Sequence, residues 1–287
     1  MSNVNLNETA PTELQDIGGV SLAYRRFGKK GAAPVVCFQH FTGTMNNFDP
    51  IHTNRLAQDR PVILVDYRGV GRSGGVMLDS MPAIAADLIA FVKALGLEEI
   101  DLFAFSIGGM IAQQFVLDAP ELVRRILLVG TGPSGGEGMQ KFSNEVMDIV
   151  NRPNSTIQGR TLDLFFSKSP ASYAAGKAWL ERIAARKLDR DPETGPQVAE
   201  AQLVALAKWG VIPATDRFSD LKKIKQRTLV VNGKDDMMVP TINSYILQQH
   251  LPDARLILYP DAGHGSHFQF SEEFAEEAAR FFGSATR

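Results

Sequence analysis

The chain has 287 residues, of which 44% are hydrophobic and 22% charged, a composition typical of one large globular domain and not of a disordered or fibrous protein. Its 30 basic and 32 acidic residues leave a net charge of −2, so we expect neither a nucleic-acid partner nor binding to an anionic membrane surface. Residues 1–15 lack the basic and apolar regions of a signal peptide, and no apolar run is long enough to span a membrane, so we expect a cytoplasmic chain.

The first half of the chain alternates predicted strands with predicted helices. Residues 20–28 alternate as an exposed strand would, whereas the next runs are continuously apolar, as in a parallel sheet covered on both faces. The only cysteine, Cys37, lies in such a run, so we expect a buried thiol in a reducing compartment. We predict strands at 20–28, 34–39, 61–67, 100–105 and 125–131, and helices at 80–96 and 107–119.

A change of pattern follows at about residue 132, where strand-like runs give way to helical periodicity until about residue 220. The earlier alternation then resumes, with strands at 227–233 and 254–260 and helices at 241–251 and 271–282. The order predicts an α/β fold with a mostly parallel, doubly wound sheet and an inserted helical cap. We divide the chain into an N-terminal extension (1–17), a first core segment (18–132), the cap (133–220) and a second core segment (221–287).

One serine stands between a predicted strand and a predicted helix, in "FAFSIGGM" at 103–110. Ala104 and Gly108 lie two positions before and after Ser106, a relaxed G-x-S-x-G pattern whose small residues allow a sharp turn that exposes the serine. Taken alone, the pentapeptide fits equally a serine that caps the helix N-terminus.

A base and an acid for this serine follow later in the chain. His264 lies in a glycine-flanked loop directly after the last predicted strand, and Asp235 and Asp236 follow the preceding strand. A weakly nucleophilic hydroxyl needs such a base and a third group that orients it. Serine, acid and histidine, each after the end of a strand, stand in the chain order of an α/β-hydrolase triad.

These motifs, together with "DYRGVGRSGG" at 66–75 and "FSIGGMIAQQF" at 105–115, resemble those of the α/β-hydrolase superfamily from about residue 18 to the C-terminus. The resemblance implies that Ser106 is the nucleophile, His264 the base and Asp236 the acid, with Asp235 as the alternative acid. It also implies an oxyanion hole made by the backbone N–H groups of Phe41 and Ile107. The loop that carries Phe41 departs from the common His-Gly form and reads Gln-His-Phe, which leaves it less conformational freedom.

The remaining histidines are not assigned to the chemistry. We expect His52 and His250 at the surface or at helix ends, and His40 in a structural role within its loop, with a direct chemical role as the alternative. His264 and His267 stand three apart, but no second cluster of ligands accompanies them, so we expect no metal site. No phosphate-binding or dinucleotide motif occurs either, so we expect no cofactor.

The sequence as a whole predicts a cofactor-independent serine esterase that acts on small to medium, apolar carboxylic esters. The same triad is compatible with perhydrolysis, lactone opening or carbon–carbon bond hydrolysis, and the fold with a non-catalytic ligand receptor. Either a monomer or a homodimer fits the sequence. Aromatic and methionine side chains of the cap and of the loop after the acid are the candidates for the substrate pocket: Phe165, Phe166, Trp179, Trp209 and Met237.

Overall fold

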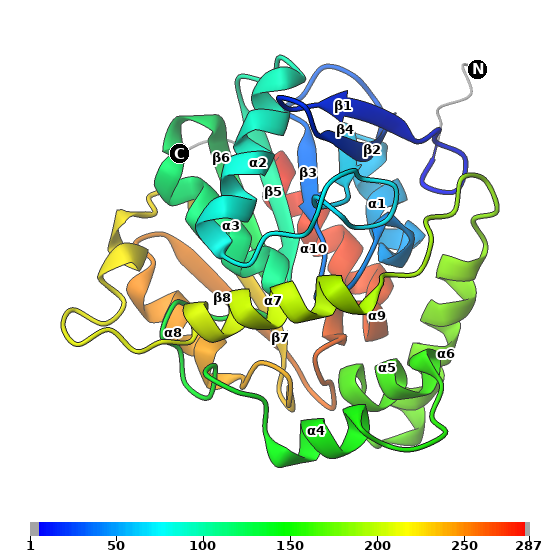
Figure 1. The fold of residues 1–287 in the computed structure, drawn as a ribbon, viewed down its shortest axis with the longest axis vertical. Coiled ribbons are helices and arrows are strands. Elements are labelled where there is room, and N and C mark those ends of the chain that lie inside the picture. Colours follow the sequence, from blue (N-terminus) through cyan, green and yellow to red (C-terminus); the bar gives the residue numbers. More distant parts are fainter. Residues whose placement is uncertain (1–5, 285–287) are drawn as a thin grey trace.

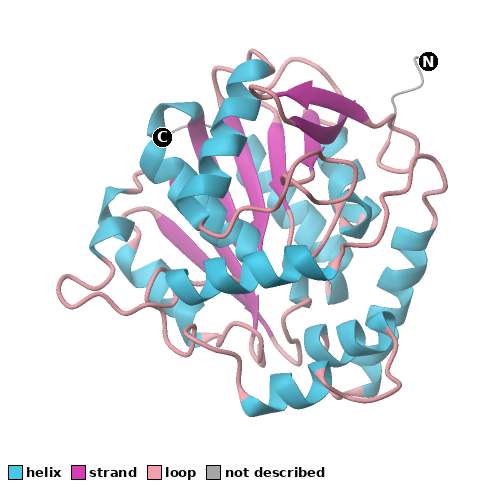
Figure 2. Ribbon diagram, in the orientation of Figure 1, coloured by secondary structure: helices cyan, strands magenta, loops and turns pink. Residues whose placement is uncertain are grey.

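A single twisted sheet forms the centre of the computed structural model, which describes residues 6–284 (Figures 1 and 2). Within these residues the sheet has eight strands, in the spatial order β1-β2-β4-β3-β5-β6-β7-β8. The strands β1 and β2 run antiparallel to their neighbours, and all other pairs are parallel. The strands are β1 Glu13–Asp16, β2 Ser21–Gly28, β3 Val35–Phe38, β4 Pro61–Val65, β5 Ile100–Phe105, β6 Val123–Val129, β7 Arg227–Gly233 and β8 Ala254–Tyr259.

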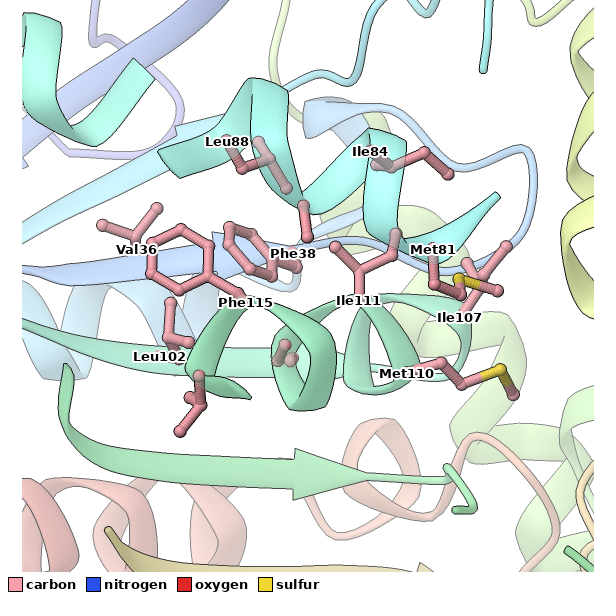
Figure 3. Close-up of a cluster of buried hydrophobic side chains, with 14 of the residues drawn as sticks. Val36, Phe38, Met81, Ile84, Leu88, Leu102, Ile107, Met110, Ile111 and Phe115 are labelled. Carbon is pink, nitrogen blue, oxygen red and sulfur yellow. The ribbon is translucent and has the colours of Figure 1, made fainter. Parts of the chain in front are cut away.

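Helices cover both faces of this sheet, which makes it the mostly parallel, doubly wound α/β sheet predicted from the sequence. On one face, α2 and α3 pack against each other and against β3 and β5, and Figure 3 shows Leu88, Ile111 and Phe115 lying beside Val36 and Phe38. On the other face, α1 packs against α10. These helices and those near β7 and β8 are α1 Pro50–Ala57, α2 Met81–Ala94, α3 Ile107–Asp118, α8 Ile242–His250, α9 Ser266–Gln269 and α10 Ser271–Gly283.

The segment between β6 and β7 contains helices and no strand among its residues, all of which the structure describes. Figure 1 shows α4, α5 and α6 gathered beyond one end of the strands, with α7 running across in front of the sheet. Two ion pairs join this segment to the core: the fully buried pair of Asp191 with Arg25, and the pair of the partly exposed Arg182 with the buried Asp49. The four helices are α4 Asn144–Val150, α5 Ile157–Phe165, α6 Pro170–Ala184 and α7 Pro196–Trp209, and short 3₁₀ turns occur at Met45–Asn47, Pro120–Leu122 and Ser219–Lys223.

Two predictions about the N-terminal part differ from the structure. The predicted exposed strand at 20–28 is mostly buried, because side chains on both of its faces pack in the hydrophobic core and because Arg25 forms a fully buried ion pair with Asp191 at 2.8 Å. The predicted N-terminal extension contains β1, which forms one of the two edges of the sheet as described. By contrast, β5 and β7 have the predicted bounds, and Cys37 is fully buried in β3, where burial raises the pKa of its thiol.

No helix within residues 6–284 is both long and apolar enough to cross a membrane.

Candidate active site

Ser106 occupies the turn between β5 and α3. Its backbone has φ 58° and ψ −123°, a conformation that is costly for any residue with a side chain, and its N–H donates to Val129 O at 2.9 Å. The turn is tight, since a Cβ on Gly108 would lie 2.6 Å from the Phe38 carbonyl oxygen. The Ser106 hydroxyl does not cap α3, so the helix-cap interpretation of the motif lacks its hydrogen bond.

A buried histidine–carboxylate pair lies at the ends of the neighbouring strands. His264 follows β8, and its Nδ1–H donates to Asp236 Oδ2 at 2.8 Å, with both side chains almost fully buried. The other oxygen, Asp236 Oδ1, accepts the backbone N–H groups of Met238 and Val239 at 2.8 and 3.0 Å. The carboxylate is therefore fixed from both sides, and it leaves His264 Nε2 as the nitrogen that can accept a proton.

Asp235, the alternative acid, lies outside this pair. Its side chain is exposed, and its backbone N–H donates to Ala262 O. The structure thus brings Asp236 and not Asp235 to His264.

Ser106 and His264 lie at the same end of the sheet, because Ser106 follows β5, His264 follows β8, and the strands β5, β6, β7 and β8 are parallel neighbours. The His264 ring lies 4.8 Å from the ring of Phe105, the residue before the serine, measured between centroids. Within residues 6–284 the structure has no hydrogen bond between Ser106 and His264. Pairs of this kind commonly tighten only when substrate binds.

The Gln-His-Phe loop after β3 is braced by its own side chains. Gln39 Oε1 accepts the His40 N–H at 2.8 Å, and the His40 Nδ1–H donates to the Phe41 carbonyl at 2.9 Å. The Tyr67 hydroxyl, in the loop that follows β4, donates to the Gln39 carbonyl at 2.8 Å. Among the described residues, the N–H groups of Phe41 and Ile107 donate to no partner, so both are free to bind an anionic oxygen.

A cavity of about 80 Å³ is lined by Ser106, Phe41 and Ile107, among other residues. Its wall is mostly apolar, and Lys141 is the only charged residue among the described residues that line it. The other lining residues come from α3, from the segment after β6, from α7 and from the loop after the acid: Met110, Gly138, Met139, Gln140, Phe142, Leu203, Leu206, Ala207, Met238 and Val239.

None of the five predicted pocket residues lines this cavity. The Phe165 ring lies between the rings of His264 and His40, at 5.2 and 5.3 Å. Phe166 and Trp179 pack in the core, where the Trp179 ring stacks on Phe268. The indole N–H of Trp209 donates to the Gly132 carbonyl, and Met237 is half-buried beside the acid. These aromatic side chains pack against other residues, whereas the cavity wall in the segment between β6 and β7 includes Met139, Phe142, Leu203 and Leu206.

The histidine predictions have mixed outcomes. His52 is in the first turn of α1, a helix end as one of the two alternatives had it, but it is fully buried and not at the surface, and its Nε2–H donates to the His267 carbonyl at 3.0 Å. His250 is the last residue of α8, as predicted. Burial lowers the pKa of both His40 and His52 to about 4, which keeps these rings neutral at neutral pH. Residues 6–284 contain no group of three His, Cys, Asp or Glu side chains placed to hold a metal ion.

Comparison with known proteins gives a consistent family. A model of the alpha/beta hydrolase fold matches residues 33–271. The solved structure of an alpha/beta hydrolase fold protein from Chitinophaga pinensis is 38% identical, with a TM-score of 0.91, covering 98% of this chain and 100% of that one.

Three curated relatives have different printed activities. RutD of Rhizobium rhizogenes, to which carbamate hydrolysis is ascribed, is 27% identical over 79% of this chain and 84% of its own. The 2-hydroxy-6-oxo-6-phenylhexa-2,4-dienoate hydrolase of Burkholderia cepacia is 28% identical, over 74% and 73%. The pimeloyl-acyl-carrier-protein methyl ester esterase of Nitrosomonas europaea is 29% identical, over 73% and 80%.

Proposed function

The chain belongs to the alpha/beta hydrolase fold family and is a hydrolase, and from this premise we propose that it is a serine hydrolase that cleaves small to medium carboxylic esters. The observation that carries the proposal is the serine on its strained turn together with the His264–Asp236 hydrogen bond at the ends of adjacent strands. A strained, uncapped serine has a cost that a purely structural role would not explain.

In this mechanism, Ser106 Oγ attacks the ester carbonyl carbon while His264 Nε2 takes the hydroxyl proton. The tetrahedral intermediate collapses, the alcohol leaves with the proton returned by His264, and an acyl-serine remains. Water then attacks the acyl group with His264 again as base, and the free acid and the serine are released. Asp236 keeps the Nδ1 proton on the ring and stabilises the imidazolium that forms in each half-reaction.

The negative charge of each intermediate falls on the former carbonyl oxygen. We assign its stabilisation to the N–H groups of Phe41 and Ile107, which have no other acceptor among the described residues. Ile107 is the first residue of α3, so the positive end of the helix dipole adds to this stabilisation.

The cavity supports a short, apolar acyl group as the preferred substrate. Its volume of about 80 Å³ is roughly half that of an engineered cavity of about 150 Å³ that holds benzene. Residues 133–220 act as a cap in this proposal, because Leu203, Leu206 and Met139 from that segment cover the serine.

Carbon–carbon bond hydrolysis is the second candidate, favoured by the name of the Burkholderia cepacia relative. The dienoate in that name carries a carboxylate, and Lys141 is the one cationic residue on the cavity wall. A non-catalytic receptor for an apolar ligand is the candidate outside enzymes.

The test combines active-site labelling with turnover. A fluorophosphonate probe should add once to the wild type, and p-nitrophenyl acetate and butyrate should be hydrolysed over many turnovers. Ser106→Ala should lose the adduct and about 10⁴- to 10⁶-fold in kcat, because the triad acts as a unit. Ser155→Ala, a serine in the turn between α4 and α5, is the matched control and should keep both.

The outcomes separate the candidates. Near-full activity in Ser106→Ala would rule out Ser106 as the nucleophile. Slow release of a single equivalent of p-nitrophenol per molecule of folded wild type would favour the non-catalytic receptor. Activity on a dienoate without activity on simple esters would favour carbon–carbon bond hydrolysis.

A further inference from the structure

The residue after Phe41 has an unfavourable backbone conformation. Thr42 has φ 56°, in the left-handed region that a β-branched residue rarely adopts. Strain of this kind persists only where surrounding contacts hold it. The Thr42 N–H belongs to the Phe41–Thr42 peptide group, which shares the Phe41 Cα with the peptide group that carries the Phe41 N–H, the proposed oxyanion donor.

Both backbone polar groups of Thr42, the N–H and the carbonyl, form hydrogen bonds with residues between β6 and β7. The Thr42 N–H donates to Gln202 Oε1 at 2.7 Å, and the Thr42 carbonyl accepts the hydroxyl of Thr194 at 2.7 Å. These partners lie 160 and 152 positions away, in α7 and in the loop that leads into it. No other hydrogen bond involves the Thr42 peptide groups among the described residues.

The side chain of Gln202 is buried between α7 and its neighbours. Its side chain is fully buried although it is a polar amide, and its Nε2 contacts Met77 Sδ at 4.0 Å. A buried amide is costly unless it is hydrogen-bonded, so the bond to Thr42 satisfies both partners at once. Leu203 and Leu206, on the same helix, line the cavity above Ser106.

We propose that Gln202, assisted by Thr194, is a positioning residue for the oxyanion hole: by holding the Phe41–Thr42 peptide group through the Thr42 N–H, it fixes the backbone of Phe41 and so keeps the Phe41 N–H directed at the reacting oxygen. The inference rests on the proposed function and extends it. The oxyanion hole is complete only while α7 is docked on the loop after β3, so docking of the cap and electrostatic stabilisation of the intermediate are one event.

The test uses a matched pair at position 202. Gln202→Met keeps the side-chain length and removes the acceptor, whereas Gln202→Glu keeps an oxygen in the place of Oε1. Loss of one oxyanion donor typically lowers kcat about 10²- to 10³-fold. We expect Gln202→Met to lower kcat for p-nitrophenyl butyrate about 10²-fold with less than about 3-fold change in KM, and Gln202→Glu to restore most of kcat. Gln197→Met, the same change at an exposed position of α7, should leave kcat unchanged.

A second readout separates positioning from a general loss of structure. A trifluoromethyl ketone that forms a tetrahedral oxyanion on the serine should bind Gln202→Met weaker by the same factor as the loss in kcat/KM. Inhibition by 1-butanol, which has the same four-carbon chain but no anionic oxygen, should change little. Equal weakening of both inhibitors would mean that Gln202 only maintains the shape of the pocket, and would overturn the proposal.

The remaining outcomes are equally distinct. If Gln202→Met does not fold, Thr194→Val against Thr194→Ser tests the other bond, since serine retains the hydroxyl and Thr194 is only half-buried. A kcat within 2-fold of wild type in a folded Gln202→Met would refute this inference while leaving the serine mechanism intact. Absence of labelling and of turnover in the wild type would instead refute the proposed function itself.

Discussion

The end of α5 and the middle of α7 both reach the proposed catalytic groups, but they hold different loops by different means. Phe165, at the end of α5, packs its ring against His264, and its carbonyl accepts the Gly265 N–H at 2.7 Å. Gln202, in α7, contacts the oxyanion loop through a side-chain hydrogen bond to Thr42. One contact is mainly apolar and the other is directional.

The difference depends on whether the core already supplies a hydrogen bond that orients the loop. Asp236, from the core itself, orients His264, so the cap needs only to cover the ring and keep water from the ion pair that forms. Thr42 has no orienting partner in the core, so the cap must supply direction as well as cover. Packing fixes where a group lies, and hydrogen bonds fix where it points.

Removing the core's own orienting group should have the largest effect. Asp236→Asn keeps the shape but reverses the preferred tautomer of His264, and we expect kcat for p-nitrophenyl butyrate to fall about 10⁴-fold. Asp235→Asn, the exposed neighbour, is the matched control and should keep the wild-type rate. Loss of activity in Asp235→Asn, with Asp236→Asn active, would reverse the assignment of the acid.

Removing the apolar cover should mainly reduce stability. Phe165 is 7% exposed, so Phe165→Ala leaves a cavity beside His264, and we expect the free energy of unfolding to fall by about 3–5 kcal/mol. Ile157→Ala, on the same helix but 54% exposed, should change it by about 0.5 kcal/mol or less. Urea unfolding measures both. Equal losses in the two variants would show that α5 is not packed on the base loop as described.

The sequence predicted the parts of the site that depend on neighbouring residues. The turn at Ser106 follows from the small residues around it, and the places of Asp236 and His264 follow from the strands that precede them. The bond between Gln202 and Thr42 joins residues 160 positions apart, and no local pattern marks it. In the sequence, Gln202 is simply a polar position in an amphipathic helix.

The differences from the sequence predictions have a related cause. The sequence places Phe165 and Trp179 in the cap segment, but it does not distinguish an aromatic side chain that packs in a core from one that lines a cavity. The burial of His52 was not predicted, because α1 is only eight residues long and was not predicted either. Its burial depends on α10 and on the loop of His267, more than 200 residues away.

The smallest predicted effect is on the pH dependence of the free energy of unfolding, and it comes from two buried histidines, one on each side of the site. His40 braces the oxyanion loop through Phe41, and His52 supports the base side through the His267 carbonyl. Burial lowers both pKa values to about 4, below the unfolded value of about 6.5. Each neutral ring therefore contributes stability above pH 6.5, and this contribution is lost as the pH falls through 4.

We expect the free energy of unfolding to fall between pH 6 and pH 4.5, with each ring contributing up to about 1.4 kcal/mol per pH unit. His40→Asn and His52→Gln keep a donor in the place of Nδ1 and Nε2 but do not titrate, so each should reduce this slope by about one proton. Urea unfolding at several pH values measures the slope, and carboxylates common to all variants cancel in the comparison. A slope unchanged in His52→Gln but reduced in His40→Asn would mean that only the oxyanion side of the site excludes the charged ring.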